Sequence, residues 1–137
     1  MPQKNEMEKA IAEAQIKQKL LTMAGFAMRA GKLVCGTDKI CDEIRRHGIP
    51  DDGENAAIRV TGVVLLASDA SDNTKKRIAN ACHFYHVELI RTSLTSDEIA
   101  SRIGRAAAAA CATFDRGFAD GMKKAVGLTR ENRRNRV

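Results

Sequence analysis

The residues best placed to contact a ligand follow a short apolar run near the middle of the chain. Residues 63–66 are four consecutive apolar side chains, as in a strand that is buried on both faces. Ser68, Asp69, Ser71 and Asp72 are polar types that favour turns and helix N-caps, and a basic helix start follows. Such a loop at a sheet edge is a common place for a ligand in α/β proteins. No phosphate-loop lysine pattern and no GxGxxG motif occurs, so a nucleotide cofactor is not indicated.

The four cysteines do not form a metal-binding pattern. They are far apart and contain no CxxC pair, so neither zinc nor any other cofactor is expected. Their simplest role is that of small buried hydrophobes, while a thiol nucleophile paired with one of the three histidines stays open from the sequence. With free thiols, no export signal and no apolar run long enough for a membrane span, the sequence predicts a cytoplasmic protein without a membrane partner.

Composition narrows the class of partner. The chain has 137 residues, enough for one domain with a sizeable core. Its net charge of +6 favours a polyanionic partner, the alternative being charge that serves only solubility. Aromatic residues make up only 4% of the chain, which argues against single-strand binding by base stacking.

Helical and strand patterns alternate along the chain. Helices are expected over residues 6–29, 36–47, 73–85, 95–103 and 115–127, with Thr95 and Glu98 as a capping box and Thr37 or Asp38 as cap of the second helix. Strands are expected over residues 32–35, 58–67, 87–91 and 111–114. The alanine run 106–110 suits a helix by propensity, but the alternation favours a strand after it. The pattern predicts an α/β fold, a three-layer α/β/α sandwich with a central mixed four-stranded sheet.

The first expected helix carries two apolar stripes on nearly opposite faces. One stripe includes Met7 and Ile11, and the other includes Ile16, Leu20 and Met23. One straight helix cannot bury both stripes in one core. We therefore predict an N-terminal helical appendage over residues 1–16, an α/β/α domain over residues 17–127 and a basic, disordered tail over residues 128–137. The appendage would pack elsewhere, contact a protein partner or mediate self-association.

Three segments of this chain resemble a known family in their order and spacing. They are AGKLVCGTDKICDEIRR, then VVLLASDASDNTKKRI, then SDEIASRIGR followed by an apolar strand and DRGFA. They resemble the ribosomal kink-turn-binding superfamily of the L-seven-Ae and L-thirty-e type, and most of all its bacterial YlxQ-like branch. The resemblance covers about residues 17–125. It implies an α/β/α sandwich that binds structured RNA, such as ribosomal RNA, without catalysis.

The resemblance also implies where RNA would bind. Relatives use three adjoining loops: the start of the second helix, the loop before the third helix, which lines the pocket of a flipped-out base, and the turn after the fourth. Backbone N–H groups at a helix start bind phosphate or base acceptors, and lysine or arginine adds phosphate contacts. Carried over to this chain, the expected RNA-binding residues are Lys32, Gly36, Thr37, Asp38, Lys39, Asp69, Asn73, Lys76, Ile103, Gly104, Arg105 and Ala106.

One departure from the family pattern concerns specificity. Archaeal and eukaryotic relatives carry Asn-Glu after Gly-Thr and a Lys three positions later, and the Asn and Lys help to read tandem sheared G·A pairs. Here these positions hold Asp38, Lys39 and Asp42. Asp38 and Asp42 add negative charge where RNA phosphates would lie, so the departure favours general RNA binding over strict kink-turn recognition.

Each expected contact also has a purely structural interpretation. Gly36 would serve only the strand-to-helix turn, Asp69 and Ser71 would only cap the third helix, and residues 75–77 would form a solvated helix face. An alternative function follows from this view, in which the fold is an assembly module whose RNA surface has decayed. Asp38, Asp42 and the two-faced first helix favour that alternative.

Overall fold

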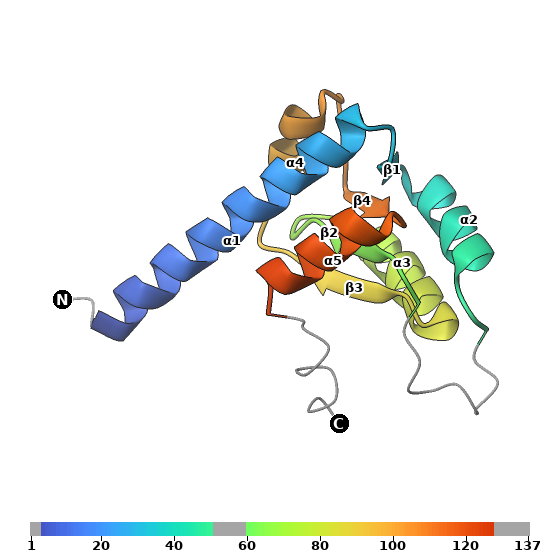
Figure 1. Ribbon diagram of the computed structural model, residues 1–137, viewed down its shortest axis with the longest axis horizontal. Helices are drawn as coiled ribbons and strands as arrows, with labels where there is room; N and C mark the ends of the chain where they lie inside the picture. Colours follow the sequence, from blue (N-terminus) through green and yellow to red (C-terminus); the bar gives the residue numbers. More distant parts are fainter. Residues whose placement is uncertain (1–3, 51–59, 128–137) are drawn as a thin grey trace.

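The computed structural model describes residues 4–50 and 60–127 as helices on both faces of a central sheet (Figure 1). The sheet has four strands in the order β1-β4-β2-β3; β2 and β3 are parallel, and β4 runs antiparallel to both of its neighbours. The sandwich and its mixed four-stranded sheet are therefore confirmed. The elements in chain order are α1 (Lys4–Arg29), β1 (Val34–Cys35), α2 (Thr37–His47), β2 (Val63–Leu66), α3 (Asp72–Tyr85), β3 (Glu88–Arg91), α4 (Ser96–Ile103), β4 (Ala110–Thr113) and α5 (Arg116–Ala125).

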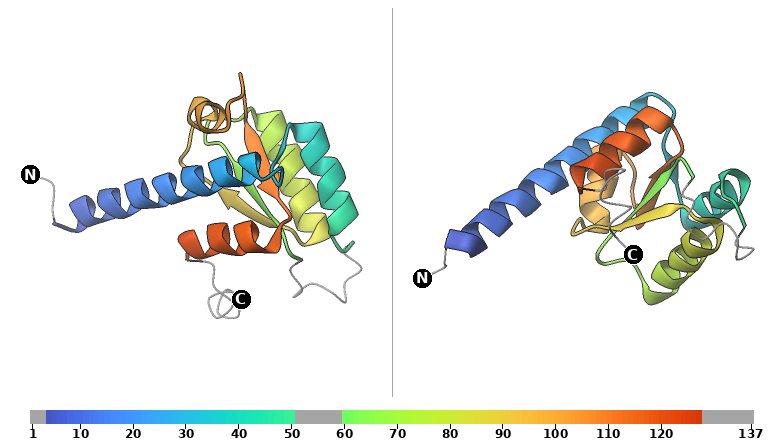
Figure 2. Two further views of the ribbon diagram at one scale, coloured as in Figure 1. Left: turned by 45° about the horizontal axis from the view of Figure 1, so that its top comes forward. Right: turned by 60° about the horizontal axis from the view of Figure 1, so that its bottom comes forward.

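The three layers follow from alternation within the buried strand β2. Val63 and Leu65 join the core beneath α1, α4 and α5, whereas Val64 and Leu66 join the core beneath α2 and α3. All four side chains are buried, because helices cover both faces of the sheet. Figure 2 shows α1 and α5 side by side on one face and α2 and α3 side by side on the other.

The last alanine of the run opens a strand at the centre of the sheet. Ala110, Cys111 and Ala112 are buried in β4 between β1 and β2, so the expected strand is confirmed and begins one residue earlier than predicted. Short side chains here let helices pack closely on both faces. The capping box of Thr95 and Glu98 at the start of α4 is also confirmed.

Three local predictions were wrong. Neither Thr37 nor Asp38 caps α2, because Gly36 occupies the N-cap position and no side chain bonds to the first turn. The strand before α2 has two residues instead of four, since Lys32 still belongs to the turn that ends α1, where its backbone N–H donates to Ala27 O. The strand expected over residues 58–67 is also shorter than predicted, because residues 60–62 are not strand and β2 begins at Val63. The polar loop expected around residues 51–55, residues 58–59 and the basic tail lie outside the described residues.

Helix α1 is one continuous helix that extends beyond the body of the protein (Figure 1). Residues 5–15 are exposed throughout, and packing begins at Ile16, which lies against the core below α4 and α5. We call residues 5–15 the extension. The division into appendage, domain and tail stays a prediction. Over the described residues, none of the helices combines the length and apolar character needed to cross a membrane.

Candidate nucleic-acid interface

Strand register brings four loops to one edge of the sheet. Cys35, the last residue of β1, lies opposite Cys111, and Leu66, the last residue of β2, lies opposite Ala110. In the parallel neighbour, Arg91 ends β3 beside Leu66. The chain therefore leaves β1, β2 and β3 at the edge where it enters β4. We call this surface the loop edge; it comprises residues 36–39, 67–71, 92–96 and 104–109.

Hydrogen bonds hold the loops together. The Ala67 N–H donates to Ala109 O at 2.9 Å, which joins the loop after β2 to the loop before β4. The Ser68 N–H donates to Leu94 O at 2.8 Å, which joins the first of these loops to the loop after β3. The Ser68 hydroxyl donates to the same oxygen at 3.2 Å. The loop after β2 is thus fixed from both sides.

The Asp69 carboxylate extends this network to α4. It accepts hydrogen bonds from the Ser96 backbone N–H at 2.8 Å and from the Ser96 hydroxyl at 2.7 Å. These hydrogen bonds lower the pKa of Asp69 below its ordinary value of 3.8. Of the two residues predicted to cap the third helix, only Ser71 does so, by accepting a hydrogen bond from the Thr74 N–H. Asp69 instead accepts hydrogen bonds from Ser96 at the start of α4.

The turn from β1 into α2 leaves a helix start without a side-chain cap. Gly36 has φ 94° and ψ 131°, a conformation that favours glycine, and a side chain added there would meet no atom within 4 Å. Among α2 to α5, only α2 begins without a side-chain cap; Ser71, Thr95 and Asp115 cap the others. Backbone N–H groups at the start of α2 therefore remain available to a bound anion or base acceptor.

Charged side chains surround this helix start. The Asp38 carboxylate accepts a 2.7 Å hydrogen bond from the Arg77 guanidinium. The hydrogen bond joins the first turn of α2 to the second turn of α3 and raises the pKa of Arg77. Burial raises the pKa of the Cys35 thiol, and the positive charges of Arg105 and Lys39 oppose that rise. Both cations therefore lie near the end of β1, Lys39 in the first turn of α2 and Arg105 in the loop before β4.

The expected site residues differ in their exposure and in whether they lie at the loop edge. The Ile103 side chain is 7% exposed and packs in the core, so it supports the turn from below. Lys32 belongs to the turn between α1 and β1 and is not part of the loop edge. Thr37 is half-buried. The exposed residues that the structure brings to the loop edge or to the adjoining start of α3 are Gly36, Asp38, Lys39, Asp69, Asn73, Lys76, Gly104, Arg105 and Ala106.

Sequence reasoning missed two contributors. Arg77 was interpreted only as part of a solvated helix face, but it contacts Asp38 across 39 positions of the chain. The loop after β3, with Thr92 and Ser96, was not among the expected RNA-binding loops. The position of this loop could have been predicted, because a strand that is parallel to β2 must end at the same edge of the sheet.

The cysteines lie in the core, where they are free and buried. Burial is the main cause that raises the pKa of the Cys111 and Cys82 thiols to about 12. Such thiols are poor nucleophiles at neutral pH. No group of three or more histidine, cysteine, aspartate or glutamate side chains in the described residues is arranged to hold a metal ion.

Comparison with known proteins gives two similar sequences and a similar fold. RNA-binding protein YlxQ of Enterococcus faecium is 35% identical over 89 residues, which are 65% of this chain and 74% of that protein. RNA-binding protein YlxQ of Bacillus subtilis is 34% identical over 98 residues, which are 72% of this chain and 85% of that protein. No family model matches the sequence. The solved structure of a Bacillus halodurans protein of unknown function has a TM-score of 0.61 at 22% identity, covers 79% of this chain and 96% of its own, and shows a shared fold alone.

Proposed function

Since this chain belongs to the YlxQ family, a bacterial branch of the kink-turn-binding superfamily, we propose that it is a non-enzymatic protein that binds structured RNA through the loop edge. The RNA would be a kink-turn-like or ribosomal RNA, and binding would take place in the cytoplasm. The observation that carries the proposal is the register of β1, β2 and β4, which brings the Gly36 turn and the Arg105 turn to the same end of the sheet.

The proposed contacts divide into backbone and side-chain groups. The uncapped first turn of α2 would donate backbone N–H groups to the RNA, and Gly36 would allow close approach. Lys39 and Arg105 would contact phosphates on either side of that turn, and Lys76 would extend the basic surface along α3. Phosphate contacts of this kind supply affinity and position, while base-edge contacts supply specificity.

The acidic residues of α2 bear on specificity. Asp42 is paired with Arg45 and Asp38 with Arg77, so each negative charge has a positive neighbour in the same protein. This pairing reduces the repulsion that the isolated carboxylates would exert on a phosphate backbone. We therefore favour RNA binding over the decayed-surface alternative, with a tolerance for RNA folds other than the strict kink-turn.

The test is a titration of labelled RNA with the full-length protein. One RNA would contain an internal loop with tandem G·A pairs, and a control RNA would have the same stems without the loop. We expect Lys39→Glu and Arg105→Glu to weaken binding of the first RNA at least tenfold. The matched control is Arg116→Glu, an exposed charge reversal after the other end of β4, which should weaken binding far less.

Salt dependence separates the two functions. An RNA-binding loop edge predicts that affinity falls with salt by roughly 0.7–0.9 log–log units per phosphate contact, and that the slope is smaller in the Lys39 and Arg105 variants. If the wild-type protein binds neither RNA at low salt, the RNA-binding proposal is wrong and the assembly-module alternative remains. Equal loss in all three variants would mean that binding follows net charge and is not located at the loop edge.

A further inference from the structure

Helix α1 exposes large apolar side chains that the body of the protein does not cover. The large hydrophobic side chains with the greatest exposure among the described residues are Ile11 (57%), Met7 (54%), Phe26 (51%) and Phe84 (46%), of which the first three lie on α1. Met7 and Ile11 are one helical turn apart, so they form a short apolar stripe on the extension. The extension carries three glutamates, at positions 6, 8 and 13, and one lysine, Lys9, so its net charge is −2.

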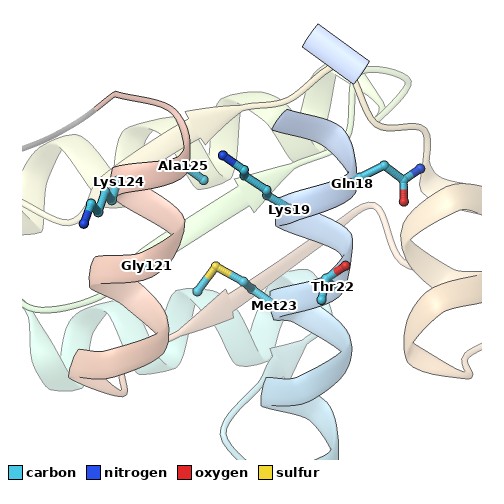
Figure 3. A pocket seen from close by; sticks show the side chains of 7 residues that line it. All are labelled: Gln18, Lys19, Thr22, Met23, Gly121, Lys124 and Ala125. Carbon is cyan, nitrogen blue, oxygen red and sulfur yellow. The ribbon is translucent and has the colours of Figure 1, made fainter. Parts of the chain in front are cut away.

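A groove with complementary properties lies between α1 and α5 (Figure 3). It has a volume of about 500 Å³ and is lined by Gln18, Lys19, Thr22, Met23, Gly121, Lys124 and Ala125. Figure 3 shows the Met23 side chain pointing toward Gly121, with Lys19 and Lys124 nearer the other end of the groove. A Cβ atom at Gly121 would lie 2.1 Å from the Met23 methyl carbon, so the glycine makes room for the thioether.

The charge of the groove can be compared with that of two segments that could bind in it, the C-terminal segment and the extension. Lys19 and Lys124 make it positive, and Met23 and Ala125 make it partly apolar. The C-terminal segment of the same chain, residues 128–137, carries four arginines and one glutamate, so its charge has the same sign as that of the groove. The extension has the opposite character, with glutamates next to Met7 and Ile11. Since the extension points away from the groove of its own chain, it can reach only the groove of another molecule (Figure 1).

We propose that two copies of this chain form a symmetric dimer in which each extension occupies the groove between α1 and α5 of the other copy. The extension and one wall of the groove belong to the same helix. A two-fold axis close to Gln15 would therefore lay the two α1 helices antiparallel, so that the face carrying Met7 and Ile11 in one copy lies along the Gln18 and Thr22 side of the groove in the other. The same two-fold rotation places each extension in the groove of the other copy, as an isologous interface requires. The proposal does not depend on RNA binding, because the loop edge takes no part in it.

The test is sedimentation equilibrium of the full-length protein between about 5 and 300 µM. We expect the wild type to approach the mass of a dimer as concentration rises. Ile11→Asp should raise the dissociation constant at least tenfold, because it places a charge in an apolar contact, and Lys124→Glu should act in the same direction. Phe84→Asp is the matched control: it replaces a similarly exposed hydrophobe on α3 and should leave association unchanged.

A mixing experiment tests the reciprocal arrangement. The Ile11→Asp protein keeps an intact groove and the Lys124→Glu protein keeps an intact extension, so their mixture forms one complete contact. The mixture should associate more strongly than either variant alone. A monomeric wild type over the whole concentration range, or a dimer that persists in Ile11→Asp, would overturn the proposal. Unfolding is excluded as a cause by equal far-ultraviolet circular dichroism, since Ile11 makes no core contact.

Discussion

The Arg77 guanidinium donates a 2.7 Å hydrogen bond to the Asp38 carboxylate and so connects the second turn of α3 with the first turn of α2. Both side chains are exposed, and Asp38 belongs to the loop edge. Because an exposed pair contributes little to stability, its main effect concerns the charge presented to a ligand. Asp38 both occupies Arg77 and places a negative charge near the start of α2.

Asp38→Asn is therefore expected to strengthen RNA binding. The change removes the negative charge and leaves Arg77 able to contact a phosphate, so affinity at low salt should rise roughly twofold to fivefold, the size of one exposed charge interaction. The measurement is the same RNA titration over a range of salt. Asp120→Asn, an equal change of charge on α5, serves as the control. Weaker binding in Asp38→Asn would show instead that Asp38 contacts the RNA or positions Arg77 for it.

Asp69→Ala is expected to destabilise the protein in a pH-dependent manner. The folded pKa of Asp69 lies below its ordinary value of 3.8, so the stabilisation is present above that pH and is lost as pH falls through the folded pKa. Urea unfolding should show a lower midpoint for the variant at pH 7, with the difference from wild type shrinking at pH 2. A difference that persists in acid would mean that packing, and not the hydrogen bonds to Ser96, accounts for the loss.

Gly36→Ala should destabilise the fold by about 1–3 kcal/mol, through backbone strain alone. Gly36 has φ 94°, and an added Cβ would contact nothing within 4 Å, so no steric clash contributes. The control is Gly117→Ala in the first turn of α5, where φ is not positive and alanine should raise stability by up to about 1 kcal/mol. The measurement is the free energy of unfolding in urea. Equal effects of the two substitutions would contradict the assignment of strain to Gly36.

The four thiols should react slowly with Ellman's reagent in the native protein and fully in denaturant. Burial raises the pKa of Cys82 and Cys111 to about 12, so neither forms much thiolate at neutral pH. Their neutral form is favoured in the folded state; the associated stability is present below the ordinary thiol pKa of 9 and is lost as pH rises toward 12. A fast-reacting thiol at pH 7 would reveal local opening, and replacing each cysteine with alanine in turn would identify it.

Local sequence patterns were sufficient to predict the layers but not the contacts between loops. The capping box at Thr95 and the strand after the alanine run depend on neighbours in the chain, and both were predicted correctly. The partner of Asp69 lies 27 positions away and that of Arg77 lies 39 positions away, so neither pairing has a local signal. Ile103 was assigned to the surface from the resemblance, although its place at the end of an amphipathic helix equally suits the core position that it holds.

The strand order also governs when the loop edge can exist during synthesis. β4 lies between β1 and β2, and β1 pairs with no other described strand. A nascent chain that ends before Ala110 therefore lacks the segment that unites the sheet, whatever its first hundred residues have formed. During translation, the surface proposed to bind RNA is therefore completed only after β4 has left the ribosome. Incomplete chains would then not compete with complete ones for the same RNA.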